Sequence, residues 1–87
     1  MTPETGSLFI ISTPIGNLGD ITYRAIEKLR SVPLVAAEDT RHTRKLFSHY
    51  GISTPLISYY EHNEFSRIPK IVAHLNSGQD LGVVSDA

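Results

Sequence analysis

The sequence predicts an α/β fold, a three-layer sandwich in which helices cover both faces of a mostly parallel sheet. Four short runs rich in apolar and β-branched residues recur about every 22 to 27 residues. They are SLFIIS (7–12), PLVAAE (33–38), PLISYY (55–60) and DLGVVSD (80–86). Three are almost continuously apolar, as in strands that are covered on both faces. The segments between them have the period of amphipathic helices, which gives the order β-α-β-α-β-α-β.

The first helix follows the loop after the opening strand. We expect Asp20 to be its N-cap, because an aspartate side chain accepts hydrogen bonds from the free N–H groups of a first turn. The residues that fall close to the helical period, and are predicted to face the core, are Ile21, Ala25, Ile26, Leu29 and Val32.

The second helix is predicted from about Thr40 to Tyr50, with Gly51 as the residue that ends it. Its apolar side carries Leu46, Phe47 and Tyr50. The opposite side, which we call the basic face, carries Arg41, Arg44, Lys45 and Ser48. This face is either a phosphate-binding surface or an ordinary solvated helix face.

The third helix is predicted to begin after Ser66 as N-cap, because Pro69 is then tolerated near the first turn. Gly78 is expected to end it. The residues predicted to face inward are Ile68, Ile71, Val72 and Leu75. The order of the strands cannot be predicted from these patterns.

Composition fits one small globular domain over residues 7–87, behind a polar tail at residues 1–6. The 87 residues carry a net charge of −1, so nucleic-acid binding would have to be local. The chain has no cysteine, and its histidines lack the spacing of a ligand set, so no metal site is predicted. The start has no signal peptide or membrane span, which favours a cytoplasmic location.

Chemistry is expected where the parallel strands end, because ligands of open parallel sheets bind beyond the carboxyl ends of the strands. Polar clusters follow all four predicted strands, at residues 12–17, 38–41, 58–61 and 85–87. The third cluster, with Tyr59, Tyr60, Glu61 and His62 at or beside it, lines a pocket edge or simply packs at a strand end. We therefore expect one shared site at this edge of the sheet, which we call the rim.

The first cluster belongs to the stretch STPIGNLGD (12–20). It lacks the G-x-G-x-x-G spacing of a dinucleotide loop and the Gly-Lys-Ser/Thr of a P-loop. Pro14, Gly16 and Asn17 favour special backbone conformations, so the loop can present N–H and C=O groups to a neutral or cationic ligand. The alternative is a tight turn between strand and helix.

The second cluster is AEDTRHTRK (37–45). Glu38 and Asp39 follow a strand end directly, and Arg41 lies in the first turn of the next helix. Glu38 and Asp39 are therefore candidates for chemistry at the rim, and Arg41 is the basic residue that we expect to take part with them. Asp39 is alternatively only the N-cap of that helix.

Three stretches together resemble the amino-terminal domain of the tetrapyrrole methylase superfamily, and within it the branch that methylates ribosomal RNA. They are FIISTPIGNLGDITYRAIEKLRSVPLVAAEDTRHTRKL (9–46), YYEHNE (59–64) and VVSDA (83–87). The resemblance implies the amino-terminal domain of a two-domain α/β methyltransferase that uses S-adenosylmethionine, held between the domains. It also implies a homodimer and, as substrate, a cytidine ribose 2′-hydroxyl in small-subunit ribosomal RNA.

The resemblance also implies roles for residues. STPIGNLGD stands where tetrapyrrole-modifying relatives have a GAGPGD-like loop, so cofactor contacts are expected from Thr13, Pro14, Gly16, Asn17, Ser85, Asp86 and Ala87. Glu38, Asp39 and Arg41 are the expected catalytic residues, with Arg41, Arg44 and Lys45 as the RNA-binding set. No membrane partner is implied.

The sequence departs from the family pattern after Ser85, Asp86 and Ala87, where the family has a further loop, a strand and a second domain. We therefore expect a truncated domain that is inactive alone and prone to self-association through uncovered apolar surface. Two other functions stay open. One is methylation of a tetrapyrrole or other small molecule, and the other is a noncatalytic RNA-binding module that uses the basic face.

Overall fold

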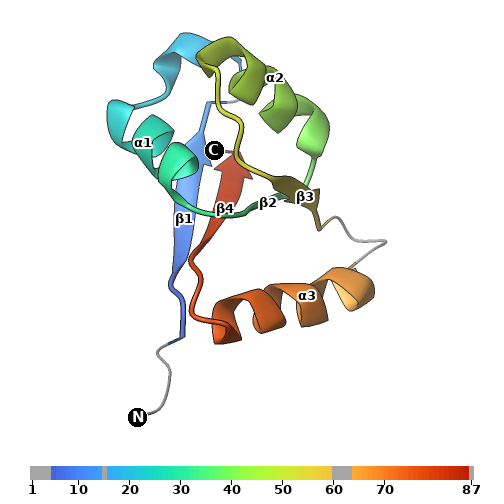
Figure 1. Cartoon of the computed structure of the whole chain (residues 1–87). Coiled ribbons are helices and arrows are strands. Elements are labelled where there is room, and N and C mark those ends of the chain that lie inside the picture. The colour runs from blue at the N-terminus through green and yellow to red at the C-terminus, as the bar shows by residue number, and fades with distance from the viewer. Residues whose placement is uncertain (1–4, 15, 60–63, 87) are drawn as a thin grey trace.

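The computed structural model describes residues 5–14, 16–59 and 64–86 (Figure 1). The side chains of residues 64–66 and 86 lie outside this description. The elements in chain order are β1 (Leu8–Thr13), a 3₁₀ turn (Leu18–Asp20), α1 (Tyr23–Ser31), β2 (Val35–Ala37), α2 (Thr40–Tyr50), β3 (Leu56–Ser58), α3 (Glu64–Asn76) and β4 (Leu81–Asp86). The predicted order of strands and helices is confirmed.

The four strands form one parallel sheet in the order β1-β4-β2-β3. The connection from β1 to β2 therefore passes β4, and the connection from β3 to β4 returns in the opposite direction. Because crossovers between parallel strands are right-handed, this reversal places α3 on the face opposite to α1 and α2 (Figure 1). The predicted α/β sandwich is confirmed.

The main core lies between the sheet and the helices α1 and α2. Its fully or almost fully buried members are Ile11, Ala25, Leu29, Val32, Val35, Ala37, Leu46, Phe47, Ile52 and Val84. Gly82 of β4 faces this core, since a Cβ atom there would lie 3.0 Å from Ile11 Cδ1 and 3.3 Å from Val32 Cγ2. The absent side chain thus allows β4 to lie under the end of α1.

The second helix has the predicted ends. Asp39 is its N-cap, and Gly51 ends it in the left-handed region, at φ 65°, where glycine avoids the cost that a Cβ atom brings. Leu46 and Phe47 are buried, and every member of the basic face is exposed. None of the described helices combines the length and the apolar character that crossing a bilayer requires.

The predicted N-cap of the first helix is wrong. Asp20 ends the 3₁₀ turn instead, and the Thr22 hydroxyl caps α1 by accepting from the Ala25 N–H at 3.1 Å. The reason is local: Asn17 Oδ1 accepts from the Gly19 N–H at 2.9 Å, which closes an earlier turn. Ile21 and Thr22 are then extended, and the α-helix begins only after them.

The predicted start of the third helix is also wrong. The helix begins at Glu64, before Ser66, and Pro69 lies inside it. Proline lacks an N–H, so it removes one backbone hydrogen bond, and the helix continues on both sides of that gap. The expected C-terminal glycine is confirmed, because Gly78 has φ 90° just beyond the helix.

Two residues predicted to face inward from α3 do not. The side chains of Ile68 and Val72 are 52% and 49% exposed, whereas Ile71 and Leu75 are half-buried. The described hydrogen bonds that dock this helix come from its C-terminal end, where Leu75 O accepts from Gly6 N–H and His74 bonds to Asp80 O. Ile68 and Val72 therefore lie on the side of α3 that faces away from the sheet.

The expected coverage of both faces fails for β1. Ile11 and Thr13 are buried, but Leu8 and Ile10 on the opposite face are exposed, Ile10 by 67%. β1 is an edge strand of the sheet, and α3 docks below β4 instead. The run LFII consequently behaves as a half-covered strand.

Candidate functional site

The rim brings together three of the predicted clusters. β4 lies between β1 and β2, with Thr13 paired to Asp86 and Ala37 paired to Val84. The loop after β1, the end of β4 and the residues after β2 therefore lie side by side, as predicted for parallel strands. Ser58 ends β3 beside Ala37. Ala87 and the predicted pocket-edge residues Tyr60, Glu61 and His62 lie outside the described residues.

The connection from β1 to α1 is held against α2 by two side chains. His42 Nε2 lies 2.8 Å from Pro14 O, and the Tyr50 hydroxyl donates to Leu18 O at 2.8 Å. Tyr50 is itself held, because its carbonyl accepts from the Arg30 guanidinium. The loop that carries the predicted cofactor contacts thus has a fixed path at both of its ends.

Within this loop the predicted contacts differ in what they can offer. The Thr13 side chain is buried, and Asn17 Oδ1 is occupied by the Gly19 N–H. At Gly16, an added Cβ atom would meet no described atom within 4 Å. The exposed backbone at Gly16 is therefore the part of the loop that a ligand can approach most closely.

A cavity of about 350 Å³ opens beside this loop. Its lining residues are Ser12, Thr13, Pro14, Gly16, Asp20, Ile21 and Thr22. This volume is at the lower end of the range for small-molecule sites, about 300 to 1,000 Å³. The cavity can hold part of a nucleoside-sized ligand.

Asp39 and Arg41 form a bidentate ion pair at the start of α2. Asp39 Oδ1 accepts from Arg41 Nε at 3.1 Å, and Oδ2 accepts from Nη2 at 2.9 Å. Asp39 Oδ1 also accepts from the Arg41 backbone N–H at 2.9 Å, which caps the helix. The hydrogen bonds from Arg41 lower the pKa of Asp39 to about 2, and those with Asp39 raise the pKa of Arg41. Both groups are therefore firmly charged near neutral pH.

Glu38 is the other carboxylate at this strand end. It is exposed, and the described residues give it no hydrogen-bond or ion-pair partner. A carboxylate that is not already bound accepts a proton more readily than one that is held by a guanidinium. Of the two predicted acids, Glu38 is thus the better placed to act as a base.

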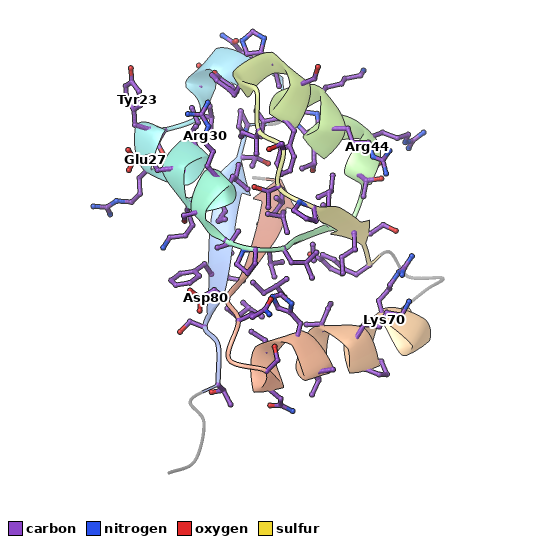
Figure 2. All side chains as sticks on the ribbon, viewed as in Figure 1. Tyr23, Glu27, Arg30, Arg44, Lys70 and Asp80 are labelled. Carbon is purple, nitrogen blue, oxygen red and sulfur yellow. The ribbon has the colours of Figure 1, made fainter. Side chains whose placement is uncertain are left out.

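Arg41 keeps donors for a ligand. The pair with Asp39 uses two of the five N–H groups that a guanidinium carries, and the side chain is 88% exposed. Arg44 and Lys45 are exposed further along α2, and Figure 2 shows Arg44 directed away from the sheet. The basic face begins at the rim and leads away from it.

Two features of the site were missed from the sequence. His42 was considered there only as a metal ligand, and Tyr50 only as an apolar residue, yet both hold the loop after β1. Their bonds go to backbone carbonyls 28 and 32 residues away, and a sequence pattern carries no signal for such contacts. Among the described residues, no group of three His, Cys, Asp or Glu side chains could hold a metal ion.

Comparison with known proteins shows close relatives. No protein-family model matches the chain. Over 82 residues it is 55% identical to ribosomal RNA small subunit methyltransferase I of Synechocystis sp., covering 94% of this chain and 29% of that protein. Proteins of the same name from Pseudomonas aeruginosa and Bacillus subtilis are 52% and 54% identical over 84 residues, covering 97% of this chain and 30% and 29% of their own lengths. The chain thus spans about 30% of the length of the relatives that it matches.

Proposed function

We propose that the natural gene product carrying this chain methylates small-subunit ribosomal RNA. The proposal starts from the similarity of the chain to ribosomal RNA small subunit methyltransferase I. The reaction is transfer of a methyl group from S-adenosylmethionine to a cytidine ribose 2′-hydroxyl. The observation that carries this proposal is the rim, where the β1–α1 loop adjoins the end of β4 and the acidic start of α2. The proposal includes a cytoplasmic homodimer in which residues 7–87 are an amino-terminal domain.

The residues of the rim fit this cofactor. The loop offers exposed backbone at Gly16 beside a cavity of about 350 Å³, and backbone carbonyls suit a ligand that carries a sulfonium cation. When bound, S-adenosylmethionine supplies an electrophilic methyl group. Thr13, Pro14, Gly16 and Asn17 would hold it from one side, and Ser85 and Asp86 from the end of β4. Ala87, which lies outside the described residues, is proposed as a further contact.

The protein's task in such a transfer is to orient the hydroxyl and accept its proton. We assign the proton to the Glu38 carboxylate, which is exposed and unpaired among the described residues. Asp39 instead fixes Arg41, because its pKa of about 2 makes it a poor base at neutral pH. The free donors of Arg41 would bind a phosphate of the RNA, and Arg44 and Lys45 would bind neighbouring phosphates.

The proposal is tested by incubating the complete gene product with methyl-labelled S-adenosylmethionine and small ribosomal subunits that lack the modification. Label at a ribose oxygen of a cytidine is the expected result. Cofactor binding without any label in RNA would contradict the substrate and favour a small-molecule acceptor. Salt-sensitive RNA binding with no cofactor binding would favour the noncatalytic module. The 87-residue chain alone is expected to transfer no label.

Single substitutions test the assigned roles in the same assay. Glu38→Gln should lower kcat about 10²- to 10⁴-fold and leave cofactor affinity unchanged, whereas Glu27→Gln on the outer side of α1 (Figure 2) is the matched control. Arg41→Ala should raise KM for RNA. If Glu38→Gln keeps wild-type kcat, Glu38 is not the base.

The place of the cofactor is tested separately with Gly16→Ala. An alanine Cβ there meets no described atom within 4 Å, so the free energy of unfolding should change by no more than about 1 kcal/mol. Affinity for S-adenosylmethionine should nevertheless fall, because the alanine side chain occupies space that the ligand needs beside the loop. Unchanged affinity would place the cofactor elsewhere.

A further inference from the structure

The β1–α1 connection is bound at two points by side chains from a single helix. Pro14 O, just after β1, lies 2.8 Å from His42 Nε2 in the first turn of α2. Leu18 O, at the start of the 3₁₀ turn, accepts from the Tyr50 hydroxyl at the last residue of the same helix. The two bonds lie on either side of Gly16 and Asn17, which are exposed. We call these two contacts the loop clamp.

The carbonyl partner of His42 determines which of its ring nitrogens carries a hydrogen. A backbone carbonyl can only accept a hydrogen bond, so Nε2 must carry the hydrogen, either in the neutral Nε2–H tautomer or in the charged ring. Both clamp contacts are partly buried, which makes an unpaired carbonyl there costly. The clamp therefore favours one path of the loop over alternatives.

Between the two clamp contacts, the described hydrogen bonds of the loop are local and run from the Gly19 and Asp20 N–H groups to Asn17. Gly16, Asn17 and Gly19 are exposed, and two of these three are glycines, which lose the most backbone freedom on ordering. A loop that its ligand must first order binds that ligand more weakly. The apparent affinity is the intrinsic affinity multiplied by the fraction of molecules in which the loop is already ordered. Fixing Pro14 and Leu18 in advance removes part of this cost.

The helix that provides the clamp also provides the acidic start of the site. Asp39 caps α2 and Arg41 pairs with Asp39, so His42 follows directly after the residues proposed to bind RNA. The cofactor loop and the RNA-facing end of α2 are thus joined through one turn of helix. The clamp therefore sets the distance between the proposed cofactor loop and the proposed RNA-binding start of α2.

We propose that His42 and Tyr50 are positioning residues, which hold the β1–α1 loop in its cofactor-binding form and so set the affinity for S-adenosylmethionine. This inference rests on the proposed function, since it assigns the loop to the cofactor. Neither residue needs to touch the cofactor or the RNA. Their effect should appear in the KM for S-adenosylmethionine and in the mobility of the loop backbone.

The test compares variants of the complete gene product. His42→Leu removes one clamp contact, and Tyr50→Phe removes the other while keeping the ring. His74→Leu is the matched control, because His74 Nε2 makes the same kind of partly buried bond, 2.7 Å to Asp80 O. That contact lies by α3, away from the rim (Figure 2). His42→Gln is the rescue, since its amide retains an N–H donor.

The first measurement is KM for S-adenosylmethionine in the methylation assay. His42→Leu and Tyr50→Phe should each raise it about three- to tenfold, the value of one hydrogen bond, with KM for RNA changed less. His42→Gln should restore most of the affinity, and His74→Leu should leave it unchanged. If His42→Leu and His74→Leu raise KM equally, the effect is general destabilisation and the inference is overturned.

The second measurement is hydrogen exchange without cofactor, which does not depend on the proposed reaction. The amides of residues 16–19 should exchange faster in His42→Leu and Tyr50→Phe than in the wild type or in His74→Leu. Unchanged exchange at these amides would overturn the clamp even if the enzyme is active. A wild-type protein that binds no S-adenosylmethionine would overturn both the cofactor assignment and the role given to the clamp, although faster exchange would still confirm the contacts.

Discussion

Asp39 performs one of its two predicted roles and adds a further one. It caps α2 as one prediction had it, and it holds Arg41 in a bidentate pair. The hydrogen bonds from Arg41 lower its pKa to about 2, so it is a poor acceptor for a proton near neutral pH. This pair supports our proposal that Glu38 is the base, a choice between the two carboxylates that AEDTR alone does not indicate.

The ion pair predicts a specific titration. The carboxyl carbon of Asp39, followed by NMR, should titrate near pH 2 in the wild type and closer to the ordinary value of 3.8 in Arg41→Ala. The pKa is depressed on folding, so the pair stabilises the protein above pH 3.8 and this contribution is lost as the pH falls towards 2.

Asp39→Asn keeps a capping side chain but removes the charge. It should therefore be less stable than the wild type at pH 7, and the difference should shrink as the pH falls towards 2. An Asp39 midpoint near 3.8 in the wild type would show that the pair does not form in solution.

At the scale of the elements, local signals decided which ends were predicted correctly. α2 has a capping aspartate and a terminal glycine in adjoining sequence, and both of its ends match. The start of α1 was misplaced because Asn17 closes an earlier turn, which moves the cap to Thr22. The exposure of Ile68 on α3 and the order of the strands depend on contacts between distant residues, which a single sequence pattern does not contain.

The corrected start of α1 gives a direct test. Thr22→Ala should lower the free energy of unfolding by about 1 kcal/mol, because the Ala25 N–H loses its acceptor. Asp20→Ala should change it by less than about 0.5 kcal/mol, since surface substitutions away from such features have small effects. Urea unfolding of both variants decides between the caps, and a larger loss in Asp20→Ala would contradict the structure.

At the scale of the whole molecule, the 87-residue chain exposes apolar side chains on the α3 side of the sheet and on α3. Ile10 is 67% exposed on the edge strand β1, and Ile68 is 52% exposed. Unpaired edge strands with apolar side chains favour association between chains. The chain therefore has an exposed apolar surface, which includes Ile10 and Ile68, in addition to the rim.

This surface predicts that the 87-residue chain self-associates as its concentration rises. Sedimentation should show a mass that increases with concentration, and Ile10→Lys should shift the chain towards the monomer, because an edge lysine opposes strand pairing. Glu27→Lys, on the exposed side of α1, is the control for added charge. A wild-type chain that stays monomeric at high concentration would contradict the prediction.

We propose above that the rim formed by the ends of β1, β4 and β2 binds the cofactor. The most direct test is a crystal structure of the complete gene product with S-adenosylhomocysteine, the product that remains after methyl transfer. We expect the ligand to lie against Gly16 and the end of β4, with its sulfur on the side of Glu38. A ligand bound away from these strand ends would contradict it.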